Sequence, residues 1–244
     1  MPEREDLRRI AIVPAFNEEA CIGRVIDEIR DFDAGLDIVV VDDGSVDRTA
    51  EVARERDAHV LRLPFNLGIG GSVQTGFRYA AENGYRLAVR VDGDGQHDPS
   101  QLALIIGPVV AGEADICVGS RWREPGEGHR STATRRIGIR VLAATVSLLT
   151  RQKVTDPTSG FQALNRKAIT LFAADYPHDY PEVEALVMLI RHRLRLREVP
   201  VQMRARAGGR SSIRAFGSVY YMVKVLLALF VGAFRRNVVP LEEQ

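Results

Sequence analysis

The sequence predicts an α/β domain whose mainly parallel central sheet carries helices on both faces. Short apolar, β-branched segments alternate with segments of helical periodicity through the first half of the chain, and this order is typical of right-handed βαβ crossovers. Residues 36–41 are apolar on both faces of an extended strand, as expected for a strand buried in a parallel sheet. A chain of 244 residues with 45% hydrophobic residues is long enough to bury one substantial core.

Strands and helices alternate regularly in the first half of the chain. Strands are expected over residues 9–15, 36–41, 59–63 and 85–91, and helices from Cys21 onward and over 47–57, 70–82 and 101–110. In sheets of this kind, ligands bind beyond the carboxyl ends of the strands. The acidic clusters of the first hundred residues follow strand ends, so we expect the site at this edge.

The second half of the chain is less regular. We expect a strand over residues 114–118, a loop rich in Gly, Pro and Arg over 123–134, an apolar helix with a basic entrance over 136–149, a turn over 156–160, a helix over 181–191, a half-exposed strand over 194–201 and a basic loop over 205–212. The sequence contains no internal repeat and no clear linker.

The last predicted element is a helix over residues 218–234 that is apolar nearly all round. A membrane-spanning helix needs about 20 apolar residues, and the central Lys224 would be costly there, so a span is not the favoured interpretation. Such a helix requires apolar surroundings on most sides. We expect it to contact a small integral-membrane partner, a second copy of the chain or the bilayer interface, rather than its own domain alone.

Charge and cysteine content restrict the environment of the protein. The formal net charge is +1, but basic residues gather in the second half and acidic residues in the first hundred. The second half should therefore attract phosphates or an anionic membrane surface, and we expect no nucleic-acid partner. Cys21 and Cys117 have neither a metal nor a redox spacing and are expected to be reduced core residues. The amino terminus lacks the apolar run of a signal peptide, which together with the cysteines favours a cytoplasmic location.

The segment Asp92-Gly93-Asp94-Gly95-Gln96-His97 carries the strongest chemical signal. Asp92 and Asp94 follow a predicted strand, and the two-residue period of an extended backbone places both carboxylates on one side. They could hold one cation or simply form a turn, because Asp and Gly are common turn residues. An EF-hand is excluded, since His97 stands where Gly is needed. Oxygen ligands without thiolates suit Mg²⁺ or Mn²⁺ carrying a diphosphate, with Gln96 as a further ligand.

Two other polar segments follow predicted strands. Asn17 with the two glutamates after it, and Asp43 with Ser45, could each serve only to cap the next helix and complement its dipole. Together with the two aspartates of the acidic motif, however, these segments place several acids at one sheet edge. Crowded carboxylates repel one another unless they bind a cation or bond to a ligand.

Six motifs stand in the same order as in family-2 glycosyltransferases: Pro14-Ala15-Phe16-Asn17-Glu18, Val41-Asp42-Asp43-Gly44-Ser45, Asn66-Leu67-Gly68, Asp92-Gly93-Asp94-Gly95-Gln96-His97, Gly119-Ser120-Arg121 and Asp156-Pro157-Thr158-Ser159-Gly160-Phe161. The chain resembles most the dolichyl/polyprenyl-phosphate mannosyl- and glucosyltransferase group, over nearly its whole length. The resemblance implies a GT-A (Rossmann-like) fold, a UDP- or GDP-linked sugar donor, a divalent metal and an inverting transfer. We accordingly expect a GT-A catalytic domain over residues 1–214, a contact helix within 215–244, and a peripheral position on the inner face of the plasma membrane.

The resemblance also assigns residues to the nucleoside. Pro14, Ala15 and Glu18 would line the nucleoside pocket, and Asp43 or its neighbour Asp42 would contact the base or the ribose.

For the phosphates, the resemblance implies that Asp92, Asp94 and Gln96 hold the metal on the diphosphate. Phosphate charge from donor or acceptor would be received by three arginines, which with Asp94 form the implied catalytic set: Arg121, Arg136 and Arg206. The chain departs from the group in two places. Ile139 stands where Ser is common, and the segment 206–212 lacks the usual Lys, for which Arg210 could substitute.

The acceptor is predicted from charge and from the lack of an obvious base. A lipid phosphate oxygen is already anionic near neutral pH, whereas a sugar hydroxyl needs a general base. Glu182 and Glu184 are the nearest base candidates, but acids at the start of a helix more often complement its dipole. We therefore predict a polyprenyl-phosphate acceptor. The alternatives are transfer to a saccharide hydroxyl, a sugar nucleotidyltransferase, disfavoured because residues 14–19 lack its Gly-rich basic motif, and a non-catalytic nucleotide-binding module.

Overall fold

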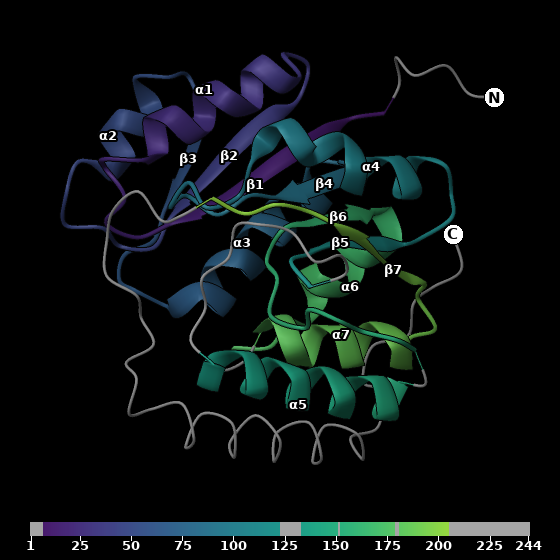
Figure 1. The fold of residues 1–244 in the computed structure, drawn as a ribbon. Helices are drawn as coiled ribbons and strands as arrows, with labels where there is room; N and C mark the ends of the chain where they lie inside the picture. The colour runs from purple at the N-terminus through teal and green to yellow at the C-terminus, as the bar shows by residue number, and fades with distance from the viewer. Residues whose placement is uncertain (1–6, 123–132, 151, 179–180, 205–244) are drawn as a thin grey trace.

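The fold is centred on a seven-stranded sheet with the strand order β3-β2-β1-β4-β6-β5-β7 (Figure 1). It is seen in a computed structural model that describes residues 7–122, 133–150, 152–178 and 181–204. Neighbouring strands are parallel except where β6 pairs with β4 and with β5. The prediction of a mainly parallel sheet in an α/β fold is therefore confirmed.

The elements have the following bounds. The strands are β1 Arg9–Ala15, β2 Asp37–Asp42, β3 His59–Arg62, β4 Leu87–Arg90, β5 Ile116–Ser120, β6 Gln162–Asn165 and β7 Leu196–Pro200. The helices are α1 Ile22–Phe32, α2 Thr49–Arg54, α3 Gly68–Glu82, the 3₁₀ turn η2 Pro99–Gln101, α4 Leu102–Val110, α5 Ala133–Thr150, α6 Arg166–Ala174 and α7 Pro181–Arg191.

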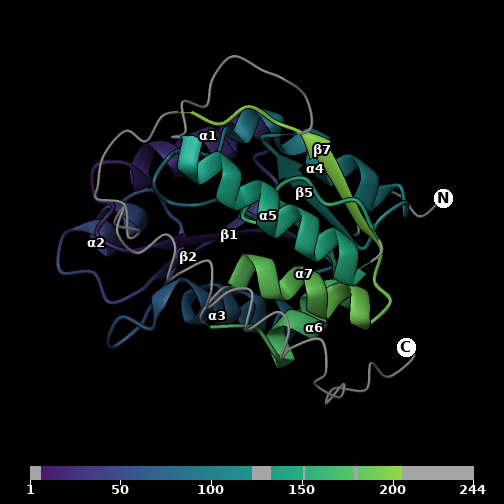
Figure 2. The same cartoon turned by 60° about the horizontal axis from the view of Figure 1, so that its bottom comes forward.

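Helices cover both faces of the sheet. One core cluster packs α1, α2 and α4 against the sheet, and the other packs α3 and α6 against the opposite face, with α7 and α5 beyond them (Figures 1 and 2). Strand β1 serves both clusters, because Ile10 and Ile12 point into one and Ala11 and Val13 into the other. This burial on both faces is the reason that the interior residues of β1 and β2 are continuously apolar.

Two elements were not predicted from the sequence, namely β6 and α6. β6 has four residues and comes almost directly after the segment 156–160, which was predicted as a turn. α6 follows without a loop, and its start is capped by Asn165, whose side chain accepts a hydrogen bond from the backbone N–H of Ala168. The expected helix over 47–57 is shorter, and α5 begins at Ala133, inside the segment expected to be a loop.

The carboxyl-terminal predictions lie largely outside the described residues. The basic loop over 205–212 and the helix over 218–234 belong to this part of the chain, so the division at 214/215 and the contacts proposed for the helix stay predictions. Among the described helices, none is both long enough and apolar enough to cross a bilayer. Cys21 and Cys117 are buried and form no disulfide, as expected for reduced core residues.

Candidate active site

The structure places the first acidic motifs together at the carboxyl edge of the sheet. β1 lies between β2 and β4, and its last residue, Ala15, pairs with Asp42 at the end of β2. On the other side, the N–H of Gly93 donates to the carbonyl oxygen of Pro14 over 3.2 Å. The segment containing Asp92 therefore runs directly beside the end of β1, as the strand-end argument predicted.

Polar side chains join the loops that follow β1 and β2. The N–H of Asn17 donates to Ser45 Oγ over 2.9 Å, and the N–H of Glu18 donates to Thr49 Oγ1 over 2.8 Å. Asn17 Oδ1 accepts from the N–H of Val46 over 3.0 Å. Helices α1 and α2 have Cys21 and Arg48 at their N-cap positions, without side-chain caps. The interpretation of Asn17 and Ser45 as helix caps is therefore wrong, because these side chains bridge two loops.

Asp42 and Asp43 are both buried, but they have different partners. Asp42 Oδ1 accepts from the N–H of Ser45 over 3.0 Å, and its Oδ2 lies 3.3 Å from Nε of Arg62. Asp43 Oδ1 accepts from the N–H of Leu67 over 2.7 Å, which fixes the loop before α3. Burial raises the pKa of Asp43 above its usual value although this backbone bond opposes the shift. Both carboxylates thus stabilise the loops that enclose the edge of the sheet.

The acidic motif after β4 alternates in burial, but it forms a turn and not the extended backbone considered from the sequence. Asp92, Asp94 and Gln96 are partly exposed, whereas Gly93 and Gly95 between them are buried. Asp94 Oδ1 accepts from the N–H of Gln96 over 3.0 Å, which closes a tight turn. Within the described part of the chain, no three His, Cys, Asp or Glu residues form a group that could hold a metal. Two carboxylates and an amide oxygen fit an oxygen-preferring cation whose remaining ligands come from a diphosphate.

His97 holds the backbone of this motif in place. Its Nδ1 accepts from the N–H of Asp92 over 2.9 Å, and its Nε2 lies 3.7 Å from Asp92 Oδ2. The ring packs against Phe161 with the centroids 5.0 Å apart. Burial lowers the pKa of His97 to about 4, so the imidazole is neutral and can act as an acceptor at Nδ1. Sequence analysis assigned no role to His97 beyond excluding an EF-hand.

Arg121 does not present its guanidinium freely to a ligand. Its Nε and Nη2 donate to the two carboxylate oxygens of Asp156 over 2.7 and 2.8 Å. Burial alone would lower the pKa of Arg121, but the pair with Asp156 raises it above the usual value. Glu198 of β7 completes the arrangement, because its carboxylate accepts from the N–H groups of Thr155 and Asp156. Neither Glu198 nor this pairing was predicted from the sequence.

Two further contacts were missed. Arg90, which is buried, donates from Nη2 to Glu182 Oε1 over 2.9 Å, so Glu182 is more than a dipole partner of α7. Arg204 donates from its N–H to the carbonyl oxygen of Gln96 over 2.9 Å and from Nη2 to Asp98 Oδ1 over 2.8 Å. An Arg ending an otherwise apolar strand was the available signal for the first contact, and for the second the sequence carried none.

The other two predicted arginines are not placed. Arg136 lies in the first turn of α5, but its side chain is outside the described part of the structure. Arg206 lies outside the described residues altogether.

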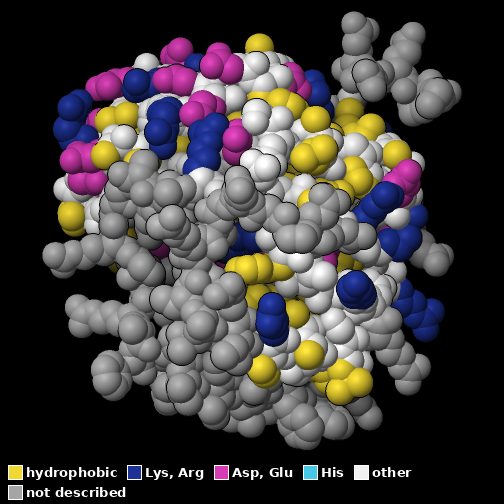
Figure 3. Space-filling view, viewed as in Figure 1, with side chains coloured by type: hydrophobic (Ala, Val, Ile, Leu, Met, Phe, Trp, Pro, Cys, Tyr) yellow, Lys and Arg dark blue, Asp and Glu magenta, His cyan; other side chains and the backbone are white. Residues whose placement is uncertain are grey.

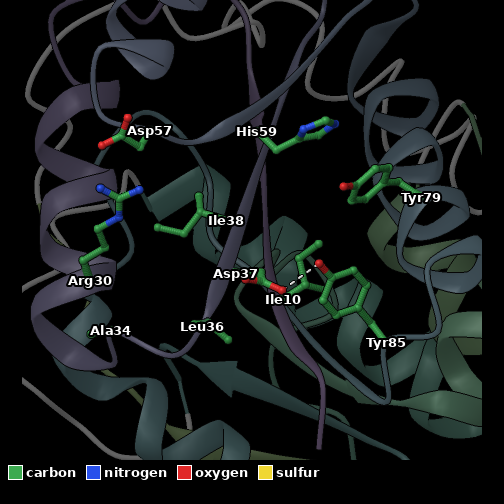
Figure 4. Close-up of a pocket in the computed structure, with 10 residues that line it drawn as sticks. All are labelled: Ile10, Arg30, Ala34, Leu36, Asp37, Ile38, Asp57, His59, Tyr79 and Tyr85. Carbon is green, nitrogen blue, oxygen red and sulfur yellow. Dashed lines mark hydrogen bonds between the residues drawn. The ribbon is translucent and has the colours of Figure 1, made fainter.

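A cavity of about 290 Å³ lies far from these residues (Figure 4). Its lining comes from the amino ends of the strands and includes Ile10, Asp37 and His59. Tyr85 Oη donates there to Asp37 Oδ2 over 2.8 Å. The cavity therefore lies at the edge of the sheet opposite the acidic motif and is no part of the candidate site.

The fold is of the GT-A class. A solved structure of glucosyl-3-phosphoglycerate synthase from Mycobacterium tuberculosis, with Mn²⁺, UDP-glucose and phosphoglyceric acid, superposes with a TM-score of 0.71 at 24% identity, over 95% of this chain and 81% of that one. The family model described as glycosyl transferase family 2 matches residues 10–172. The chain belongs to this family.

The names of several relatives include a lipid phosphate. An undecaprenyl-phosphate mannosyltransferase from Micrococcus luteus is 32% identical over 85% of this chain and 88% of its own length. A UDP-N-acetylglucosamine–dolichyl-phosphate N-acetylglucosaminyltransferase from Methanococcus voltae is 30% identical over 78% of this chain and 83% of its own. The resemblance to the polyprenyl-phosphate group, stated from the motifs, is thereby confirmed.

The neutral state of His97 predicts a pH dependence of stability. The unfolded chain takes up a proton near the usual histidine pKa of 6.5, whereas the folded chain does so only at about 4. Stability from this residue is therefore present above pH 6.5 and is lost as the pH falls toward 4. As the pH falls through this window, we expect the free energy of unfolding of the parent to decrease relative to that of His97→Gln, by up to about 1.4 kcal/mol per pH unit.

Urea denaturation at several pH values measures this difference, with His59→Gln, at an exposed position, as the matched control. Parallel curves for parent and His97→Gln between these two pH values would show that the imidazole is not held neutral.

Proposed function

We propose that the protein is an inverting, metal-dependent transferase that moves a hexosyl unit from a nucleoside-diphosphate sugar to a polyprenyl phosphate. The observation that carries the proposal is the position of the segment Asp92–Asp94 beside the end of β1, whose other neighbour in the sheet is β2. In a parallel α/β sheet this edge is where a nucleotide binds. Family membership supports glycosyl transfer, and the names of the relatives support a lipid phosphate as acceptor.

The loops after β1 and β2 are the proposed nucleoside pocket. Pro14, Ala15 and Glu18 come from the first loop, and Asp42 and Asp43 from the second. The hydrogen bonds that join the two loops hold these residues in a fixed relation before any ligand arrives. We assign the contact with base or ribose to Asp43 or Asp42, as the motif suggests.

Asp92, Asp94 and Gln96 are the residues that would hold Mg²⁺ or Mn²⁺ on the diphosphate. Their oxygen atoms are of the type that these ions prefer, and a structural relative of this fold was crystallised with Mn²⁺ and UDP-glucose. When bound, the ion supplies positive charge where the diphosphate leaves. Asp92 stays ionised and able to bind a cation, because Arg90 and the other nearby charges lower its pKa although burial opposes this shift.

Arginines would stabilise the remaining phosphate charge. Arg121 contributes its charge from within the pair with Asp156, so we assign direct phosphate contacts to Arg136 and Arg206. The structure supports Arg206 through Arg204, two residues earlier, whose N–H is bonded to Gln96 of the acidic motif. Arg204, the last residue that the structure describes, therefore lies beside the proposed diphosphate site. Charge stabilisation of this kind commonly contributes more to the rate than any other single effect.

The acceptor oxygen would attack the anomeric carbon from the side opposite the leaving diphosphate. A phosphate monoester presents this oxygen as an anion, so no side chain has to remove a proton. Glu182, one of the two base candidates, already accepts a hydrogen bond from the guanidinium of Arg90. This favours a phosphate over a saccharide hydroxyl as the acceptor.

Helix α5 offers a surface that suits an anionic membrane. Val141, Ala144 and Leu148 lie at helical spacing and are exposed, with Leu148 80% exposed. Arg140 and Lys153 are exposed near the two ends of this row. Over α5 the surface shows apolar and basic side chains, whereas acidic side chains gather over α1 and α2 (Figure 3). We propose that this face of α5 lies on the bilayer surface, as in interfacial amphipathic helices.

Removal of the metal or of its ligands tests the reaction. Chelation by EDTA should abolish transfer of labelled sugar into a chloroform-soluble product, and Mn²⁺ or Mg²⁺ should restore it. Asp94→Asn should lower the rate by roughly a hundredfold or more, because charge at the leaving group is no longer balanced. Asp37→Asn, at the opposite edge, is the control and should retain the parental rate. Transfer that is unaffected by both EDTA and Asp94→Asn, with UDP- and GDP-sugars, would refute the proposal.

Glu184→Gln separates the two acceptor classes. With a phosphate acceptor we expect a change of about threefold or less, because no proton has to be removed. A general base would instead cost about 10²–10⁴-fold. The assay compares polyprenyl phosphate with free saccharides as acceptors, and a large loss on saccharides would favour the hydroxyl-acceptor alternative.

Leu148→Glu tests the membrane face. A carboxylate in the exposed row should reduce binding to vesicles containing anionic lipid, because it adds repulsion and removes apolar contact. Co-sedimentation with such vesicles measures the binding, and Leu104→Glu, a change at another exposed leucine on α4, is the matched control. Equal binding by parent and Leu148→Glu would exclude this face.

A further inference from the structure

Arg90 is the largest side chain that is fully buried among the described residues, with only 1% exposure. It ends β4 in the middle of the sheet, where its backbone pairs with Ile12 of β1 and Gln162 of β6. A buried guanidinium is tolerated only where carboxylates pair with it. The carboxylates that pair with Arg90 therefore indicate its role in the structure.

The guanidinium joins two carboxylates from distant parts of the chain. Nε donates to Asp92 Oδ1 over 3.1 Å, and Nη2 donates to Glu182 Oε1 over 2.9 Å. Burial alone would lower the pKa of Arg90, but the charges of Asp92 and Glu182 raise it, so the group stays cationic. One residue thus connects the acidic motif after β4 with the first turn of α7.

Gly160 closes the space around this contact. A Cβ atom at this position would lie 2.8 Å from Arg90 Nη2 and 3.1 Å from Asp92 Oδ2. The backbone before β6 is therefore packed directly against the ion pair, and the carboxylate of Asp92 has little room to turn on this side. The contact between Arg90 and Asp92 is therefore held by a hydrogen bond and also enclosed by the backbone of Gly160.

We propose that Arg90 is a positioning residue that fixes Asp92 relative to α7, with Glu182 as its anchor and not as a general base. α7 packs against α5, the helix with the exposed apolar row. The contact therefore joins the acidic motif on the donor side to the helical layer on the membrane side. This inference rests on the proposed function for the role of Asp92 at the metal, but the contact itself can be tested separately.

Four variants separate positioning from catalysis and from folding. Glu182→Gln keeps an oxygen that can accept from Nη2, so we expect the rate to stay within about threefold of the parent, where a base would lose about 10²–10⁴-fold. Arg90→Met leaves both carboxylates unpaired, and we expect a rate loss of about thirtyfold or more at saturating donor and Mn²⁺. The double variant Arg90→Met/Glu182→Met should regain thermal stability without regaining rate. Arg197→Met, an exposed arginine on β7, is the control.

Each outcome decides the proposal. If the rate recovers with stability in the double variant, Arg90 acts only in folding; if Glu182→Gln loses as much as a base would, Glu182 is not an anchor. Should Arg90→Met fail to fold, Arg90→Lys replaces it, because Lys keeps the charge but cannot hold both carboxylates in a fixed fork. For Arg90→Lys we expect a rate loss of about tenfold or more, and parental rate would overturn the proposal.

Amide hydrogen exchange tests the contact without any substrate. In metal-free, nucleotide-free protein, Arg90→Lys should speed exchange in residues 92–98 and in the first turn of α7 together, by about tenfold or more, while Arg197→Met changes neither. Faster exchange in only one of these segments, or in none, would overturn the proposal. Absence of transfer in the parent with all donors would count against the proposed function, whereas this exchange result would still decide the role of Arg90.

Discussion

Pairing of buried charges beneath the carboxyl edge of the sheet is the constraint on which the site depends. Arg90 and Arg121 are removed from water almost completely, and such groups are stable only when carboxylates bind them. The guanidinium of Arg90 donates hydrogen bonds to Asp92 and Glu182, and that of Arg121 donates to both carboxylate oxygens of Asp156. These carboxylates belong to segments that are far apart in the sequence. The pairing of these two arginines with carboxylates therefore fixes the end of β4, the loop before β6 and the start of α7 relative to one another.

The reversed direction of β6 makes this arrangement possible. Because β6 is antiparallel to both of its neighbours, its amino end lies at the edge where the other strands end. The loop of residues 156–160 is thereby brought to the site instead of to the opposite edge. Ser159 Oγ donates to the carbonyl oxygen of Gly119 over 2.6 Å, and the N–H of Asp156 donates to Glu198 Oε1 over 3.0 Å, so hydrogen bonds hold the loop to β5 and β7. A fully parallel sheet would leave Arg121 without its partner.

The two halves of the site differ in how they are held. Backbone N–H groups bonded to side-chain oxygens join the loops after β1 and β2, whereas ion pairs hold the part around β4, β6 and α7. The first kind of contact fixes the loops that we propose as the nucleoside pocket. The second includes Asp92 itself, which pairs with Arg90 and remains partly exposed, as does Asp94. These two carboxylates are the ones that we propose for a divalent ion on a diphosphate. Family membership shows a glycosyltransferase, and the proposed function places the transfer at this edge.

The sequence by itself determined the order of most strands and helices and the position of the acidic motifs after strand ends at one edge of the sheet. Each follows from local rules, because strand period, helix period and strand ends are set by neighbouring residues. Only the tertiary structure decided that Asn17 and Ser45 bridge loops rather than cap helices, that Arg121 is bound to Asp156, and that β6 and α6 exist. It also decided the partner of Glu182. These contacts join residues 28 to 92 positions apart, and their formation depends on how whole elements pack, which no local pattern of residues encodes.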